Sequence, residues 1–117
     1  MKNISRLFLD KFSKEACYDL MIQVTRLIRE HTKPEKIIFF GSITTDQFDV
    51  MSDVDVVIVF ADLEEASRAR KMLYSVDRAP ISQAIDFVCV DRSTYESKSQ
   101  IGGVCFIARE SGIEAKA

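Results

Sequence analysis

The chain has 117 residues, of which 47% are hydrophobic and 29% charged, so its composition is that of one globular domain spanning residues 1–117, not of a disordered segment. Its 16 basic and 18 acidic residues give a formal net charge of −2, which disfavours a general nucleic-acid or membrane-surface binder. No apolar run approaches the roughly 18 residues of a transmembrane helix, so we expect a cytoplasmic protein without a membrane partner.

The first regular elements predicted by the sequence are a helix and a buried strand. Apolar residues recur every three or four positions over residues 13–31, which indicates an amphipathic helix. Ser13 is suited to cap its start, and Pro34 should end it near Thr32. Residues 36–40 form a short run of isoleucine and phenylalanine, typical of a buried strand.

A loop and a second strand follow. Residues 42–51 lack a sustained apolar run, and we expect them to open with a helical turn. We also expect Phe48, Val50 and Met51 to pack inward. Residues 53–60 are almost continuously apolar, which is typical of a strand in a covered sheet. The connection between the two strands suits either a hairpin-like return or a short crossover.

The second half of the chain predicts two helices and one more strand. Asp62 is suited to cap a helix that ends before Pro80. Residues 83–90 predict a third strand, and residues 93–110 a last helix, interrupted by two glycines and capped by Ser93 or Thr94. A short edge strand can begin at Ile113. The order of elements indicates an α/β or α+β domain of two layers.

Three aspartates stand where these strands would bury them. Asp53 and Asp55 are two residues apart and would point to the same face of a strand. Asp86 interrupts the third strand in the same way. Neighbouring carboxylates repel each other, and a divalent cation between them would relieve that repulsion. Carboxylate oxygens suit Mg²⁺ or Mn²⁺, so the three aspartates are candidate metal ligands.

A phosphate-binding turn is predicted at the end of the first strand. Gly41 permits close backbone approach, and Ser42 offers a hydroxyl and the start of a helical turn. An isolated Asp-x-Asp also occurs in capped strands and turns. Its combination with Gly41-Ser42 and Asp86 favours a site for a nucleotide and a metal over that structural interpretation.

The spacing of these residues resembles a known family. Gly41-Ser42, ten residues, then Asp53-Val-Asp55 is similar to the GS-x10-DxD signature of the minimal nucleotidyltransferases, within the DNA polymerase β-like superfamily. The resemblance extends from residue 13 to residue 113. It implies a mixed β-sheet flanked by α-helices. It also implies transfer of a nucleoside monophosphate, such as AMP from ATP, to an acceptor.

The resemblance also assigns roles to the residues. It implies that Asp53 and Asp55 ligate the metals, and that Asp86 completes the catalytic site and activates the acceptor hydroxyl. Gly41 and Ser42 would hold the triphosphate.

The resemblance implies a partner protein as well. Family members of this size often act beside a small all-helical HEPN-type protein, as antitoxins that adenylylate a tyrosine of the toxin. The sequence does not decide whether the chain also forms a homo-oligomer. Residues 43–52 contain neither the arginine nor the glycine common in the family at this point. This difference supports an alternative, a binding module that neutralises its partner by contact. A small-molecule acceptor or a growing nucleic acid would need more binding surface than 117 residues supply.

Overall fold

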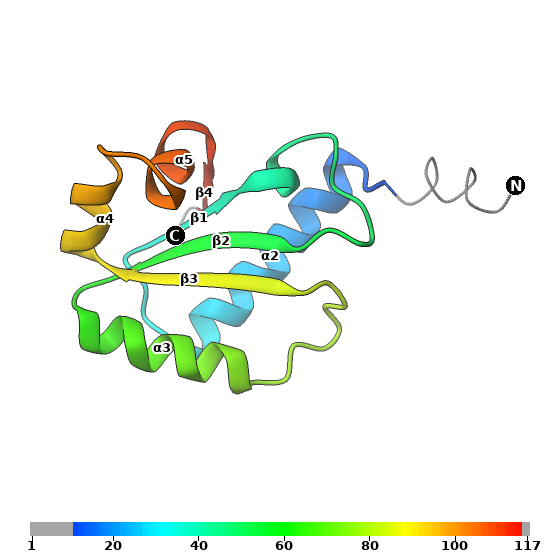
Figure 1. Ribbon diagram of the computed structural model, residues 1–117. Coiled ribbons are helices and arrows are strands. Elements are labelled where there is room, and N and C mark those ends of the chain that lie inside the picture. Colours follow the sequence, from blue (N-terminus) through cyan, green and yellow to red (C-terminus); the bar gives the residue numbers. More distant parts are fainter. Residues whose placement is uncertain (1–10, 116–117) are drawn as a thin grey trace, which may run out of the picture.

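The computed structural model describes residues 11–115, in which a four-stranded sheet lies among helices (Figure 1). The elements in chain order are α2 (Lys14–His31), β1 (Lys36–Phe40), the 3₁₀-helix η1 (Gly41–Thr44), β2 (Val54–Phe60), α3 (Leu63–Ser75), β3 (Ile85–Asp91), α4 (Arg92–Lys98), α5 (Val104–Ser111) and β4 (Ile113–Glu114). This composition confirms the predicted α/β (α+β) class. Within residues 11–115, no helix combines the length and the apolar character needed to cross a membrane.

The sheet is mixed, with the strand order β3-β2-β1-β4. Strand β1 runs antiparallel to both β2 and β4, whereas β2 and β3 are parallel. The connection from β1 to β2 is therefore the hairpin-like return and not the crossover. The short edge strand expected from Ile113 is present as β4, paired with β1.

Helices cover both faces of the sheet, which gives three layers instead of the two expected. Helices α2 and α3 pack on one face, against residues such as Ile37, Val56 and Phe87. Helices α4 and α5 contribute Tyr95 and Ala108 to a second cluster on the other face, which includes Ile38, Val57 and Val59. The reason is that β2 is apolar on both faces along most of its length, so both need cover.

Local hydrogen bonds from capping side chains fix where the helices begin. The Ser13 hydroxyl accepts a bond from the Ala16 amide at 3.0 Å, and the Asp62 carboxylate accepts one from the Glu65 amide at 2.9 Å, as predicted. Helix α4 begins earlier than expected, because Asp91 at the end of β3 caps it in place of Ser93 or Thr94.

The last predicted helix is two helices. Gly102 and Gly103 have φ angles of 141° and 82°, which a continuing α-helix does not permit. The chain turns there between α4 and α5, so that both helices contact the sheet (Figure 1).

The loop between η1 and β2 is anchored by one side chain. Phe48 is fully buried, and its ring packs edge-on against Phe12 with 5.1 Å between the ring centroids. The Phe12 amide also donates to the Phe48 carbonyl at 2.9 Å. The expectation that Val50 and Met51 pack inward is wrong, since they are 45% and 76% exposed. A turn from Asp49 directs both outward.

Truncation of one buried and one exposed apolar side chain of this loop should distinguish the residue that anchors it from one that lies on the surface. Phe48→Ala should lower the free energy of unfolding by about 3–5 kcal/mol, because it leaves a cavity beside Phe12. Met51→Ala should change it by no more than about 0.5 kcal/mol, since its side chain lies in solvent. Urea unfolding monitored by circular dichroism measures both. Equal effects of the two substitutions would contradict the burial of Phe48.

Candidate functional site

The five predicted site residues lie at one end of the sheet. Strand β1 ends at Phe40, and because β2 is antiparallel to it, β2 begins at the same end. Strand β3 is parallel to β2 and also begins there. Phe40, Asp55 and Asp86 consequently form one row across three strands, with Asp55 paired in register to each of the others. The fold thus unites residues that are 31 positions apart in the sequence, Asp55 and Asp86.

The environment of Asp55 differs from that of the other two aspartates. Asp55 is half-buried, whereas Asp53 and Asp86 are exposed. Burial raises the pKa of the Asp55 carboxyl, and the negative charges of Asp86 and Asp53 raise it further. The three carboxylates are therefore close enough to interact electrostatically, as the sequence predicted.

Gly41 touches the Asp55 carboxylate so closely that no side chain fits between them. A β-carbon on Gly41 would lie 2.6 Å from Asp55 Oδ2. Gly41 also has a φ angle of 76°, in the left-handed region that favours glycine. The glycine of the predicted phosphate turn and the middle aspartate of the predicted metal site are therefore direct neighbours.

Ser42 lies in the 3₁₀-helix η1, which confirms the helical turn expected at this point. Its carbonyl accepts bonds from the Thr45 hydroxyl at 2.8 Å and the Thr45 amide at 3.0 Å, and the Thr44 hydroxyl donates to the Gly41 carbonyl at 2.8 Å. These bonds fix the backbone of the turn. Ser42 itself is half-buried, on the same turn as Gly41.

One of the two acidic residues in the loop is engaged by its own turn. The Asp49 carboxylate accepts bonds from the Met51 amide at 2.8 Å and the Ser52 hydroxyl at 3.2 Å. Asp46 is exposed, and its carboxylate accepts a bond from the Gln47 side chain at 2.8 Å. Asp46 is therefore the more exposed of the two acidic residues of the loop.

Tyr74, in the last turn of α3, contacts Asp86, and the sequence did not indicate this. Its hydroxyl lies 3.2 Å from Asp86 Oδ1 and accepts a hydrogen bond from the Phe87 amide at 2.9 Å. An amphipathic pattern shows that a helix packs on a sheet, but not which residue of its last turn reaches past the edge strand. No sequence signal could have identified this contact.

The donor chemistry of the site fits a hard cation, although the part of the chain that the structure describes contains no preformed three-ligand group. Within residues 11–115, no three His, Cys, Asp or Glu side chains come together as a metal-binding group. Mg²⁺ commonly takes one or two protein carboxylates and completes its coordination with water and substrate phosphates. Asp53 and Asp55, with the Asp55 carboxylate packed against Gly41, fit an ion of that kind.

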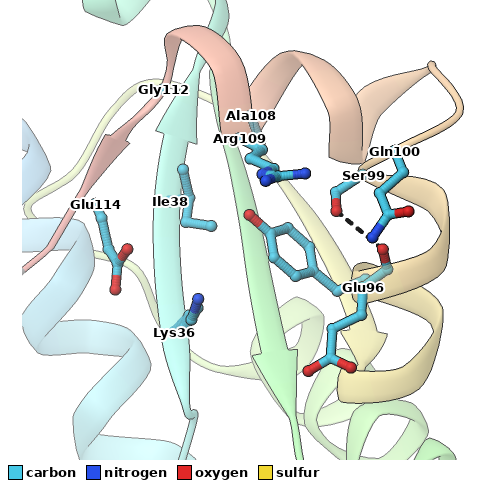
Figure 2. A pocket seen from close by; sticks show the side chains of 10 residues that line it. Lys36, Ile38, Glu96, Ser99, Gln100, Ala108, Arg109, Gly112 and Glu114 are labelled. Carbon is cyan, nitrogen blue, oxygen red and sulfur yellow. Dashed lines mark hydrogen bonds between the residues drawn. The ribbon is translucent and has the colours of Figure 1, made fainter.

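A pocket of about 360 Å³ lies elsewhere, over β1 between α4, α5 and β4 (Figure 2). Tyr95 lies in it, with the Lys36 ammonium 5.6 Å from its ring centroid. Arg109, Glu96 and Glu114 also line the pocket, so its walls carry charges of both signs. None of the five predicted site residues lines it, and its mixed charge selects no class of ligand.

The contact between Gly41 and Asp55 can be tested against a second glycine with a similar φ angle. Gly41→Ala and Gly103→Ala should each lose about 1–2 kcal/mol of stability, because both positions have left-handed φ angles. Only Gly41→Ala should also move the Asp55 carboxylate, since a β-carbon built on Gly103 would have no atom within 4 Å beyond its chain neighbours. Unfolding curves measure the first effect, and the ¹³C chemical shift of the Asp55 carboxyl the second. An unchanged Asp55 resonance in Gly41→Ala would refute the contact.

The repulsion among the carboxylates should be visible in the titration of Asp55. Asp86→Asn should lower the pKa of Asp55, because it removes a neighbouring negative charge, while the part due to burial persists. NMR titration of the carboxyl carbon measures the change, with Asp19→Asn on α2 as the control. An Asp55 pKa unaffected by Asp86→Asn would argue against electrostatic contact.

The raised pKa of Asp55 also predicts how the stability of the fold changes with pH. A raised folded-state pKa means that Asp55 stabilises the fold only while protonated, so its contribution is complete below the ordinary pKa of about 4 and is lost as pH rises through the folded value. Asp86→Asn should reduce this loss, and urea unfolding between pH 3 and 7 would show it.

Comparison with known proteins identifies the family. A family model described as Polymerase beta, Nucleotidyltransferase matches residues 22–110, about three quarters of the chain, and this range contains all five predicted site residues. No curated protein matches the chain. No solved structure matches it either. The chain belongs to the polymerase β-type nucleotidyltransferase family.

Proposed function

We propose that the protein is a magnesium-dependent minimal nucleotidyltransferase that moves AMP from ATP to a hydroxyl group of a protein acceptor. The observation that supports this most is the meeting of Gly41, Asp55 and Asp86 at one end of the sheet. A glycine turn for phosphates and a group of carboxylates in that arrangement are the parts that phosphoryl and nucleotidyl transfer need.

The proposed binding roles follow from position. The absence of a side chain on Gly41 lets the Asp55 carboxylate lie against the backbone of the turn that would hold the triphosphate, and Ser42 lies on the same turn. Asp53 and Asp55 would hold Mg²⁺ or Mn²⁺, which when bound would neutralise phosphate charge. The raised pKa of Asp55 fits a carboxylate that gains from a bound cation.

The proposed reaction assigns the proton to Asp86. The acceptor oxygen forms a bond to the α-phosphorus, the bond from that phosphorus to the bridging oxygen breaks, and pyrophosphate leaves. Asp86 receives the proton of the hydroxyl on Oδ2, because Oδ1 lies against the Tyr74 hydroxyl. Asp86 is exposed at the start of an edge strand, so an acceptor from another protein can reach it.

As acceptor we propose a small all-helical HEPN-type protein, so that this chain acts as the antitoxin of a toxin–antitoxin pair in the cytoplasm. The exposed position of Asp86 on an edge strand supports an acceptor that another protein brings to the site. An experiment can address this directly, with the product of an adjacent reading frame of that type as the acceptor.

Labelled ATP tests the transferase. With Mg²⁺ and ATP labelled at the α-phosphate, the wild type should label the HEPN-type protein, and the double variant Asp53→Asn/Asp55→Asn should reduce labelling to background. Asparagine preserves the shape of each side chain and removes its charge, so circular dichroism should show an intact fold. Asp46→Ala, in the neighbouring loop, is the matched control and should keep the activity. Labelling by the double variant at the wild-type rate would contradict the metal assignment.

The second candidate is a binding module that neutralises the same partner by contact. The loop between Gly41 and Asp53 favours it, because that loop offers a triphosphate no basic side chain and exposes Val50 and Met51. A partner that stays unlabelled, yet is inhibited equally by the wild type and by the double variant, would establish this function in place of transfer.

A further inference from the structure

We propose that Tyr74 is a positioning residue for the transfer reaction: its hydroxyl holds one oxygen of the Asp86 carboxylate and leaves the other free for the acceptor's proton. This inference rests on the proposed function, since Tyr74 acts through Asp86. Tyr74 lies on α3. The buried side chains of α3 pack on one face of the sheet, and those of α4 and α5 pack on the other face.

The direction of the hydrogen bonds supports this role. The Tyr74 oxygen accepts a bond from the Phe87 amide at 2.9 Å, so the single hydroxyl proton must go elsewhere. Two acceptors are within reach, Asp86 Oδ1 at 3.2 Å and the Phe87 carbonyl at 3.5 Å. The carboxylate is both nearer and charged, and bonds to charged acceptors are the stronger ones. The proton therefore points at Asp86.

The ring of Tyr74 is held in place from two sides. The Phe87 ring packs edge-on against it at 5.2 Å between centroids and an interplanar angle of 87°. The Arg70 guanidinium, one helical turn earlier on α3, lies 5.3 Å from the Tyr74 ring centroid. These contacts fix the hydroxyl beside the edge of β3 although 46% of the residue surface is exposed.

Without the contact to Tyr74, two effects would leave the Asp86 side chain without a fixed orientation. It is exposed and stands at the open edge of the sheet, where an aspartate side chain would otherwise change rotamer freely. The Asp55 carboxylate, its register partner, repels it. A donor on the outer side opposes both effects and keeps Asp86 in a single orientation toward an incoming hydroxyl group.

A purely structural role predicts something different. The Tyr74 hydroxyl also satisfies the outward-facing Phe87 amide of an edge strand, and this would protect the edge and stabilise the fold. In that case its loss would lower stability without changing the rate of transfer by the folded protein. The test must therefore measure the rate, and not the stability alone.

Tyr74→Phe removes the hydroxyl and retains the ring. In the assay with labelled ATP, Mg²⁺ and the HEPN-type protein, it should lower kcat roughly tenfold, because one charge-assisted hydrogen bond is lost. The KM for ATP should stay within twofold of the wild-type value, since Tyr74 does not line the phosphate turn. The matched control is Tyr18→Phe on α2, which is 44% exposed and should keep the wild-type kcat.

A double-mutant cycle with Asp86→Asn decides between positioning and structure. If Tyr74 acts through Asp86, Tyr74→Phe should cause no further loss of kcat in the Asp86→Asn background. An independent, full loss in that background, or a wild-type kcat for Tyr74→Phe alone, would overturn the inference. If the wild type itself transfers nothing, the proposed function fails together with this role. If the wild type is active and the cycle is additive, only the role of Tyr74 fails.

Discussion

The close approach of Gly41 to the Asp55 carboxylate is the constraint on which the candidate site depends. A β-carbon would lie 2.6 Å from Oδ2, and a positive φ angle turns the chain out of β1 at the same residue. After η1 and the loop, β2 returns antiparallel to β1, with Phe40 opposite Asp55. The parallel pairing of β3 then adds Asp86 to the row. The absence of a side chain on Gly41 thus permits the contact between the two halves of the motif.

The site carries an electrostatic cost that the rest of the fold must offset. Asp55 is half-buried and close to two other carboxylates, so its ionised form is disfavoured in the folded protein. The apolar clusters on both faces of β2 supply stability that does not depend on these charges. Functional sites commonly retain such local strain, because a ligand of opposite charge relieves it. In this family that ligand is generally a divalent metal with a nucleoside triphosphate.

The loop between the two halves of the motif is mostly polar in composition, but a buried side chain and the hydrogen bonds of a turn hold it in place. Phe48 anchors it in the core, and Asp49 stabilises its last turn, so neither residue faces the phosphate turn as a free side chain. Met51 is left exposed beside the site. The loop thus offers a triphosphate no basic side chain and exposes an apolar one, which is the feature that separates the proposed transferase from the proposed binding module.

Local signals in the sequence determined the helices, the strands and most of their ends. Ser13 and Asp62 cap the helices they were expected to cap, because capping needs only residues three positions away. The tertiary structure alone decided the antiparallel return, the third layer and the contact between Tyr74 and Asp86. These features depend on the register of the strands and on how the helices pack on the sheet. Both bring together residues that are far apart in the chain, and no local spacing in the sequence encodes such contacts.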